Sequence, residues 1–178
     1  MGRMAGKQPD SGPTTATVAR NVERLRIQQG MNYTELSERL QSKAGWSINA
    51  VGIRRIEARE RRVTPDDLTA LAVALGVSPV SLLMPNTAQK DEDIEVTGLR
   101  RQYTAEQVWE WLCATSTGYY PVEHESVEAF FRRAWPQWKQ EREHAWLEGI
   151  DEVHAGMREK ARQLMAMHEN TEAQRGDD

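Results

Sequence analysis

Residues 49–62 have the sequence NAVGIRRIEARERR, the most distinctive pattern in this chain. Ile53 and Ile56 stand three residues apart, a spacing that places both on one inner face of a helix. Around them are five arginines within nine residues, offset by only two glutamates. A helix with an apolar inner face and a basic outer face fits a DNA groove flanked by phosphates. On charge alone, an ordinary solvated surface helix explains the pattern equally well.

The residues just upstream predict a second helix. Residues 32–35, NYTE, match a capping box, in which Asn32 accepts from first-turn amides and Glu35 reaches back to residue 32. Leu36 and Leu40 then fall on one helical face. Two short amphipathic helices in succession, the second of them basic, favour the DNA-binding interpretation.

In order and spacing, residues 16–85 resemble the XRE-type helix-turn-helix domains, relatives of the lambda repressor and Cro. The residues that carry the resemblance are Gly30-Met31-Asn32, Leu36, Leu40, Ile53, Arg55-Ile56-Glu57 and residues 71–78, LAVALGVS. The resemblance implies an all-α, lambda-repressor-like domain of five helices over residues 15–85 that binds double-stranded DNA. The turn between the two motif helices is longer than usual, as in a subset of actinobacterial regulators of this type. We interpret residues 41–49 as an enlarged loop in which Trp46 covers the edge of the core.

The resemblance also assigns roles to single positions. The base-contacting positions of the family correspond to Ala50, Val51 and Arg55, with Arg54 beside them and Asn49 as the helix cap or a reader of adenine. Arginine matches guanine through two hydrogen bonds, whereas alanine and valine can contact only a thymine methyl group. The expected phosphate contacts are Tyr33, Thr34, Lys43, Arg59, Arg61 and Arg62.

The resemblance further implies a structural pair. In the family, an arginine of the first helix pairs with the glutamate that ends the recognition helix, the helix that contacts the bases. Arg26 and Glu57 occupy these two positions here, and the recognition helix is the one predicted over residues 49–57. A bidentate pair ties the first helix to the recognition helix and fixes its angle. The alternative is that both side chains are exposed.

Composition and charge favour a cytoplasmic protein whose N-terminal half faces DNA. No apolar run approaches the ~20 residues that span a bilayer, and the first fifteen residues lack the apolar core of a signal peptide. The single cysteine, Cys113, cannot form an internal disulfide, which fits a reducing compartment. Residues 14–85 carry ten Lys/Arg against seven Asp/Glu, and residues 86–178 carry eleven against nineteen. DNA would repel the acidic C-terminal half, residues 86–178.

Changes in composition and the helix-capping residues predict that the chain has five parts. These are a disordered arm (1–14), the DNA-binding domain (15–85), a linker with a brief strand (86–102), an acidic helical region (103–168) and a disordered tail (169–178). Thr64-Pro65 and Gly76 bound the fourth helix of the DNA-binding domain, and Thr104 opens the first helix of the C-terminal half.

The last helix has a seven-residue apolar repeat with one polar interruption, Lys160. Its members are Trp146, Ile150, Val153, Met157, Leu164 and Met167. Three heptads are the minimum for a coiled coil, so the repeat predicts a seam between two copies of the chain. The alternative is an amphipathic helix that packs in its own chain against the helix of Trp109 and Trp111.

The sequence has no pattern of catalytic chemistry. The four histidines are not spaced as metal ligands, and there is no glycine-rich phosphate loop or paired catalytic carboxylate. We therefore expect no enzyme activity, no cofactor and no metal.

Three hypotheses about function remain. The first is a repressor-like transcription regulator that binds an operator as a homodimer. The second is an antitoxin-like or adaptor protein whose C-terminal helices bind a partner protein. The third is a protein-interaction module that has lost DNA affinity, which Ala50 and Val51 favour and the arginine cluster opposes.

Overall fold

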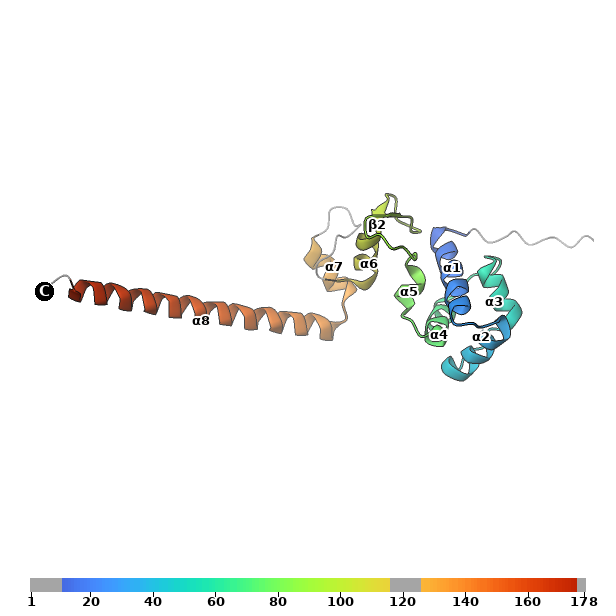
Figure 1. Cartoon of the computed structure of the whole chain (residues 1–178), viewed down its shortest axis with the longest axis horizontal. Coiled ribbons are helices and arrows are strands. Elements are labelled where there is room, and N and C mark those ends of the chain that lie inside the picture. The colour runs from blue at the N-terminus through green and yellow to red at the C-terminus, as the bar shows by residue number, and fades with distance from the viewer. Residues whose placement is uncertain (1–10, 116–125, 176–178) are drawn as a thin grey trace, which may run out of the picture. The chain divides into compact units, whose positions relative to one another are not determined.

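The structure is a computed structural model that describes residues 11–115 and 126–175, shown in Figure 1. The side chains of residues 147, 148, 151, 164 and 166–175 are outside this description. Most of the predicted arm, residues 1–10, and the end of the predicted tail, residues 176–178, also lie outside the described residues. The chain divides into two compact units, residues 1–123 and 124–178.

The first unit begins with the five predicted helices, and the predicted all-α class is confirmed. These helices are α1 (Pro13–Gln28), α2 (Tyr33–Arg39), α3 (Ala50–Glu57), α4 (Pro65–Leu75) and α5 (Pro79–Leu83). Asn32 caps α2 by accepting from the amides of Thr34 and Glu35 at 2.8 and 3.0 Å, and Glu35 accepts from the Asn32 amide at 2.7 Å. Thr64 caps α4 in the same reciprocal way.

The interpretation of residues 41–49 as a loop is wrong for its first half. A π-helical turn, η1 (Leu40–Ala44), continues α2 without a break. Gly45 then ends the helix in the left-handed conformation, with φ of +61°. The extra residues of the turn therefore lengthen the second helix before the chain turns into α3.

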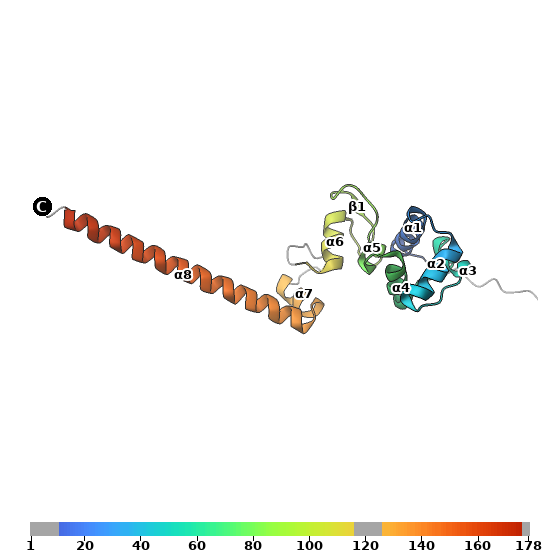
Figure 2. The ribbon, with the colours of Figure 1, turned by 60° about the horizontal axis from the view of Figure 1, so that its bottom comes forward.

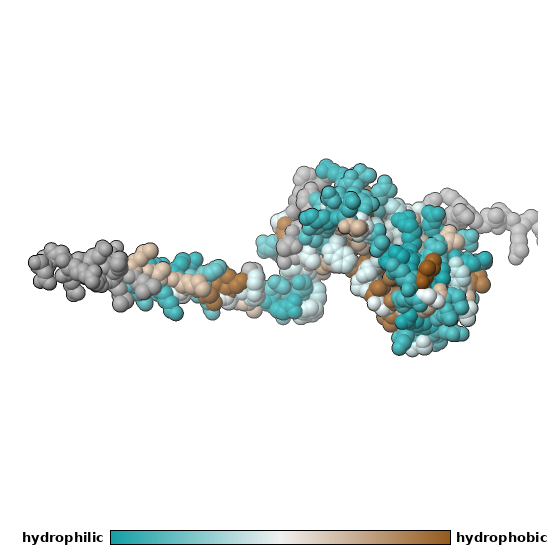
Figure 3. All heavy atoms as spheres, viewed as in Figure 1, coloured by the Kyte–Doolittle hydropathy of each residue, from teal (hydrophilic) through white to brown (hydrophobic). Residues whose placement is uncertain are grey.

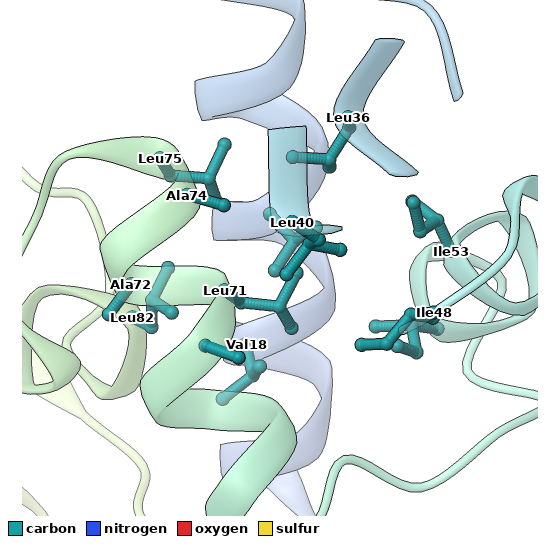
Figure 4. Packing of buried hydrophobic residues seen from close by; sticks show 13 residues of the cluster. Val18, Leu36, Leu40, Ile48, Ile53, Leu71, Ala72, Ala74, Leu75 and Leu82 are labelled. Atoms are coloured by element: carbon teal, nitrogen blue, oxygen red, sulfur yellow. The ribbon is translucent and has the colours of Figure 1, made fainter. Parts of the chain in front are cut away.

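A single apolar core joins α1 to α5 (Figure 4). Its largest fully buried side chains come from every helix of the domain and are Val22, Leu36, Leu40, Ile53, Ile56, Leu71 and Leu82. Asn21 of α1 adds a polar tie, since its amide nitrogen lies 3.1 Å from the carbonyl of Leu82 and 2.7 Å from that of Met84. These hydrogen bonds join α1 to the C-terminal end of α5.

A second, smaller cluster follows α5. β1 (Asp93–Ile94) pairs antiparallel with β2 (Tyr103–Thr104), and α6 (Ala105–Cys113) begins directly afterwards. Ile94 is buried against Ala105 and Val108. The predicted linker, residues 86–102, thus contributes a strand to a packed cluster. Its residue Thr97 exchanges two hydrogen bonds with Thr14 at the start of α1, at 3.3 and 2.9 Å.

The second unit contains α7 (Val127–Ala134) and α8 (Gln137–Arg175). The ring of Phe131 stacks on that of Trp135 with centroids 3.9 Å apart, and the ammonium group of Lys139 lies 3.9 Å from the Trp135 centroid. Figure 2 shows α8 as one uninterrupted helix, which ends seven residues beyond its predicted end at His168. Among the described residues, no helix combines the length and the apolar character needed to cross a membrane.

Candidate nucleic-acid interface

Two isoleucines and a capped first turn seat α3 on the core. Ile53 and Ile56 are almost fully buried, and Ile48, just before the helix, is buried with them. The Asn49 side-chain oxygen accepts a 2.7 Å hydrogen bond from the amide of Gly52 and so satisfies one free amide of the first turn. The cap therefore engages the oxygen that an asparagine also uses when it reads adenine.

Gly52 allows the start of α3 to close tightly. A Cβ atom at this position would lie 3.0 Å from the Cγ2 of Ile48 and 3.2 Å from the capping oxygen of Asn49. Because both distances are shorter than ordinary contacts, a side chain here would press on the residues that begin the helix.

The outward face of α3 presents one apolar and two cationic side chains. Val51 is 50 % exposed, and Arg54 and Arg55 are both exposed. Ala50, which was also predicted to contact bases, is half-buried. A guanidinium can donate two hydrogen bonds to the O6 and N7 of guanine, and a valine can contact the methyl group of thymine. This face therefore has the chemistry needed to discriminate base pairs.

The C-terminal end of α3 is closed by an arginine in an unusual conformation. Arg59 has a φ of +63°, and the amides of Glu60 and Arg61 both donate to the carbonyl of Arg55, at 2.8 and 3.1 Å. Glycine is the usual residue at such a helix end, because a side chain in the left-handed region costs about 1 kcal/mol. The chain thus keeps an exposed cation where glycine would relieve strain.

Arg26 and Glu57 form the bidentate pair that the resemblance implies. The Nε and NH2 atoms of Arg26 each donate a 2.7 Å hydrogen bond to Glu57, and NH1 donates to the carbonyl of Met31 at 2.8 Å. The two side chains are only 9 % and 4 % exposed. The hydrogen bond to Glu57 raises the pKa of Arg26 above its ordinary value. α1 is thereby locked to the last residue of α3.

Two residues expected to contact phosphates are already engaged within the domain. The ring of Tyr33 lies under the Arg26 guanidinium, 4.2 Å from its central carbon, and is half-buried. The backbone amide of Thr34 donates to the Asn32 cap, although the residue is exposed. Tyr33 therefore braces the Arg26–Glu57 pair, and Thr34 keeps only its hydroxyl group for a phosphate.

The lengthened turn and the segment after α3 meet at one buried carboxylate, that of Asp67 in α4. The Trp46 Nε1 donates to Asp67 Oδ1 at 2.9 Å. Arg61 NH2 and the amide of Thr64 donate to Oδ2 at 3.0 and 3.2 Å. Burial raises the pKa of Asp67, but the hydrogen bonds from Trp46 and Thr64 and the charge of Arg61 outweigh it and hold the pKa below its ordinary value.

The sequence patterns do not predict the role of this carboxylate, and they place Arg61 among the expected phosphate contacts. Arg61 instead forms an ion pair with Asp67, and its NH1 atom is buried as well. The signal in the sequence is Trp46, a large aromatic residue among polar neighbours that needs a partner for its N–H. Lys43, Arg59 and Arg62 are exposed, as a phosphate contact requires.

Other chemistry is sparse in the part of the chain that the structure describes. No three histidine, cysteine, aspartate or glutamate side chains lie close enough together there to hold a metal ion. Cys113 is a free thiol, half-buried at the end of α6, and its burial raises its pKa. A thiol with a raised pKa is a poor nucleophile.

The comparison with protein families points to the same part of the chain. A family model described as "Helix-turn-helix" matches residues 22–82. Among solved structures, the chain is similar to a hypothetical transcription factor, NHTF, from Neisseria. That similarity has 22% sequence identity and a TM-score of 0.36, and it covers 44% of this chain and 88% of the other. No curated protein matches the chain.

Proposed function

Since residues 22–82 belong to the XRE-type helix-turn-helix family of DNA-binding regulators, we propose that the protein is a repressor-like transcription regulator that binds an operator through α3. One observation carries this proposal. α3 buries Ile53 and Ile56 while exposing Val51, Arg54 and Arg55. Its first turn is capped by Asn49, and its last residue is paired with Arg26 of α1. A rigid helix with an exposed arginine face is suited to reading a major groove.

Base recognition in this proposal rests on Arg55, with Arg54 beside it. A bidentate contact from arginine to guanine contributes about 1–3 kcal/mol of discrimination against a wrong base. Val51 would supply an apolar contact to thymine. Asn49 keeps an amide nitrogen for a base or phosphate, because only its oxygen serves the cap.

Phosphate contacts come from the cations that are not engaged within the domain. Lys43 on η1 and Arg59 and Arg62 after α3 are exposed on segments that flank the two motif helices. Arg61 has a structural role instead, because its guanidinium is bound to Asp67. Phosphate contacts give affinity and register without sequence preference.

Two copies are needed for tight operator binding, because one short helix contacts only one major groove. Dimeric helix-turn-helix proteins place two recognition helices about 34 Å apart on an approximately palindromic site. We assign pairing to α8, whose Trp146, Val153 and Met157 side chains are 56–63 % exposed within this chain.

The same exposed side chains favour a second candidate function, that of an adaptor. In that case α8 binds a different protein, and DNA binding serves to place that partner or to control its synthesis. Light scattering separates the two candidates: a purified dimer favours the regulator, and a monomer favours the adaptor.

Salt-dependent binding to duplex DNA tests the DNA-binding function. If each protomer neutralises about three phosphates, through Lys43, Arg59 and Arg62, log affinity should fall with log salt at a slope of about −3 per protomer. Arg158→Ala, which removes an exposed arginine from α8, is the matched control and should leave the slope unchanged. A flat salt dependence of the wild-type protein would contradict the proposal.

A further inference from the structure

α8 presents large apolar side chains to solvent along an uninterrupted helix (Figure 3). Trp146 is 60 % exposed, Val153 56 % and Met157 63 %. Together with the half-buried Ile150, they follow the alternating steps of four and three residues that define a coiled-coil seam. Such a face is stable in water when another helix covers it.

Two charged residues occupy the same seam on either side of this apolar centre. Continuing the steps toward the N-terminus gives Glu143, three residues before Trp146, and continuing them toward the C-terminus gives Lys160, three after Met157. One charge is negative and the other positive, and the four apolar positions lie between them. Along the seam, one acidic residue is therefore followed by four apolar residues and then by one basic residue.

From this arrangement we infer that α8 pairs with α8 of a second copy in an antiparallel orientation, with Glu143 of each helix facing Lys160 of the other. The inference rests on the proposed pairing of two copies and adds the direction and register of the pair. A parallel pair would set Glu143 against Glu143 and Lys160 against Lys160, and like charges at facing positions are unfavourable. The antiparallel register turns both repulsions into attractions.

The same register matches the apolar positions to one another. Ile150 of one helix faces Val153 of the other, and Trp146 faces Met157, so each layer joins one larger and one smaller or more flexible side chain. On one flank, Gly149 of one helix comes beside Gly156 of the other. Open space surrounds both glycines in the single chain, so their lack of side chains lets the two backbones approach closely there.

An antiparallel pair has a consequence for DNA binding. Its two-fold axis passes between residues 151 and 152, and with a rise of about 1.5 Å per residue the two Gln137 residues lie about 44 Å apart along the coil. The two DNA-binding units therefore attach at opposite ends of the coil.

Disulfide formation between engineered cysteines reports the orientation. In a Cys113→Ser background, Glu143→Cys and Lys160→Cys are prepared as separate proteins, together with Arg158→Cys as a control outside the seam. Neither seam variant alone should cross-link, because equivalent residues in the antiparallel pair lie about 25 Å apart. An oxidised mixture of the two should give a covalent dimer of Glu143→Cys with Lys160→Cys.

The other outcomes overturn the inference in distinguishable ways. If each variant cross-links alone and the mixture gives no preference for the heterodimer, the coil is parallel, and the proposed pairing survives while its direction is wrong. If light scattering shows that the uncross-linked full chain is a monomer at micromolar concentration, both the pairing and the register are refuted. The salt-dependent binding of duplex DNA by the first unit is measured separately and does not depend on either result.

Charge reversal provides an independent check that needs no cross-link. Lys160→Glu alone and Glu143→Lys alone should each raise the dimer dissociation constant by about tenfold or more, because they create facing like charges. The double variant restores opposite charges and should return the dissociation constant close to that of the wild type. Unchanged dissociation constants for both single variants would contradict the antiparallel register. In a parallel pair each position faces only itself, so reversing its charge replaces one pair of like charges by another.

Discussion

The indole nitrogen of Trp46 donates a 2.9 Å hydrogen bond to Asp67, which joins the lengthened turn to the first turn of α4. The other oxygen of that carboxylate accepts from Arg61, which follows α3. One buried acceptor thus links the segments before and after α3. The Arg26–Glu57 pair separately holds the last residue of α3. These contacts explain how a longer turn is accommodated beside a firmly held α3.

The Asp67 carboxylate should make the domain sensitive to acid. Its pKa is lowered in the folded state, so its contribution to stability is present above the unfolded pKa of about 3.9 and is lost as the pH falls through the lower folded value. Asp67→Asn removes this contribution. Calorimetric unfolding from pH 6 to pH 2 should therefore show a stability difference between wild type and variant that narrows below about pH 4. A difference that stays constant over this range would show that Asp67 is not ionised in the fold.

Glu57→Ala should destabilise the DNA-binding domain by about 3 kcal/mol, because it leaves Arg26 buried without its carboxylate. For a domain of this size, the loss lowers Tm by more than about 10 °C in calorimetry. Glu60→Ala, which removes an exposed glutamate three residues away, is the control and should change Tm very little. An equal Tm for Glu57→Ala and the wild type would refute a structural role for the pair.

Much of the domain was predictable because its helices carry local signals. The caps at Asn32 and Thr64 and the isoleucines of α3 are defined by residues within a few positions of one another. The Arg26–Glu57 pair spans 31 residues, and only the family resemblance indicated it.

The features that escaped prediction depend on contacts between distant segments. η1 has no distinctive sequence, and the Trp46–Asp67 bond that anchors the turn after it joins residues 21 positions apart. The role of Arg61 was missed for a related reason. A count of charges treats five arginines alike, although only their surroundings decide which one pairs with a buried carboxylate.

Arg59→Gly should have opposite effects on folding and on DNA binding. Glycine relieves the left-handed strain at φ of +63°, so the domain should gain up to about 1 kcal/mol of stability. Loss of the cation should weaken binding to all DNA sequences and make the salt slope shallower by about 0.9. The control is Arg59→Ala, which removes the same charge without relieving the strain. Unchanged DNA affinity in both variants would remove Arg59 from the phosphate contacts.

Arg55→Ala and Arg62→Ala should separate base recognition from phosphate binding. Arg55→Ala is expected to cost about 1–3 kcal/mol on a cognate site and little on random DNA. Arg62→Ala should weaken both by a similar factor. Fluorescence anisotropy with the two duplexes measures these losses. Equal losses on both DNAs for Arg55→Ala would reassign that residue to the phosphates.

Selection from a pool of random DNA duplexes tests most directly whether α3 reads sequence. The full chain should enrich an approximately palindromic site with two half-sites. A folded Arg54→Ala, Arg55→Ala variant should still bind DNA at low salt through Lys43, Arg59 and Arg62 but should enrich no sequence. Enrichment of the same site by the variant, or failure of the wild-type protein to enrich any site, would contradict the account.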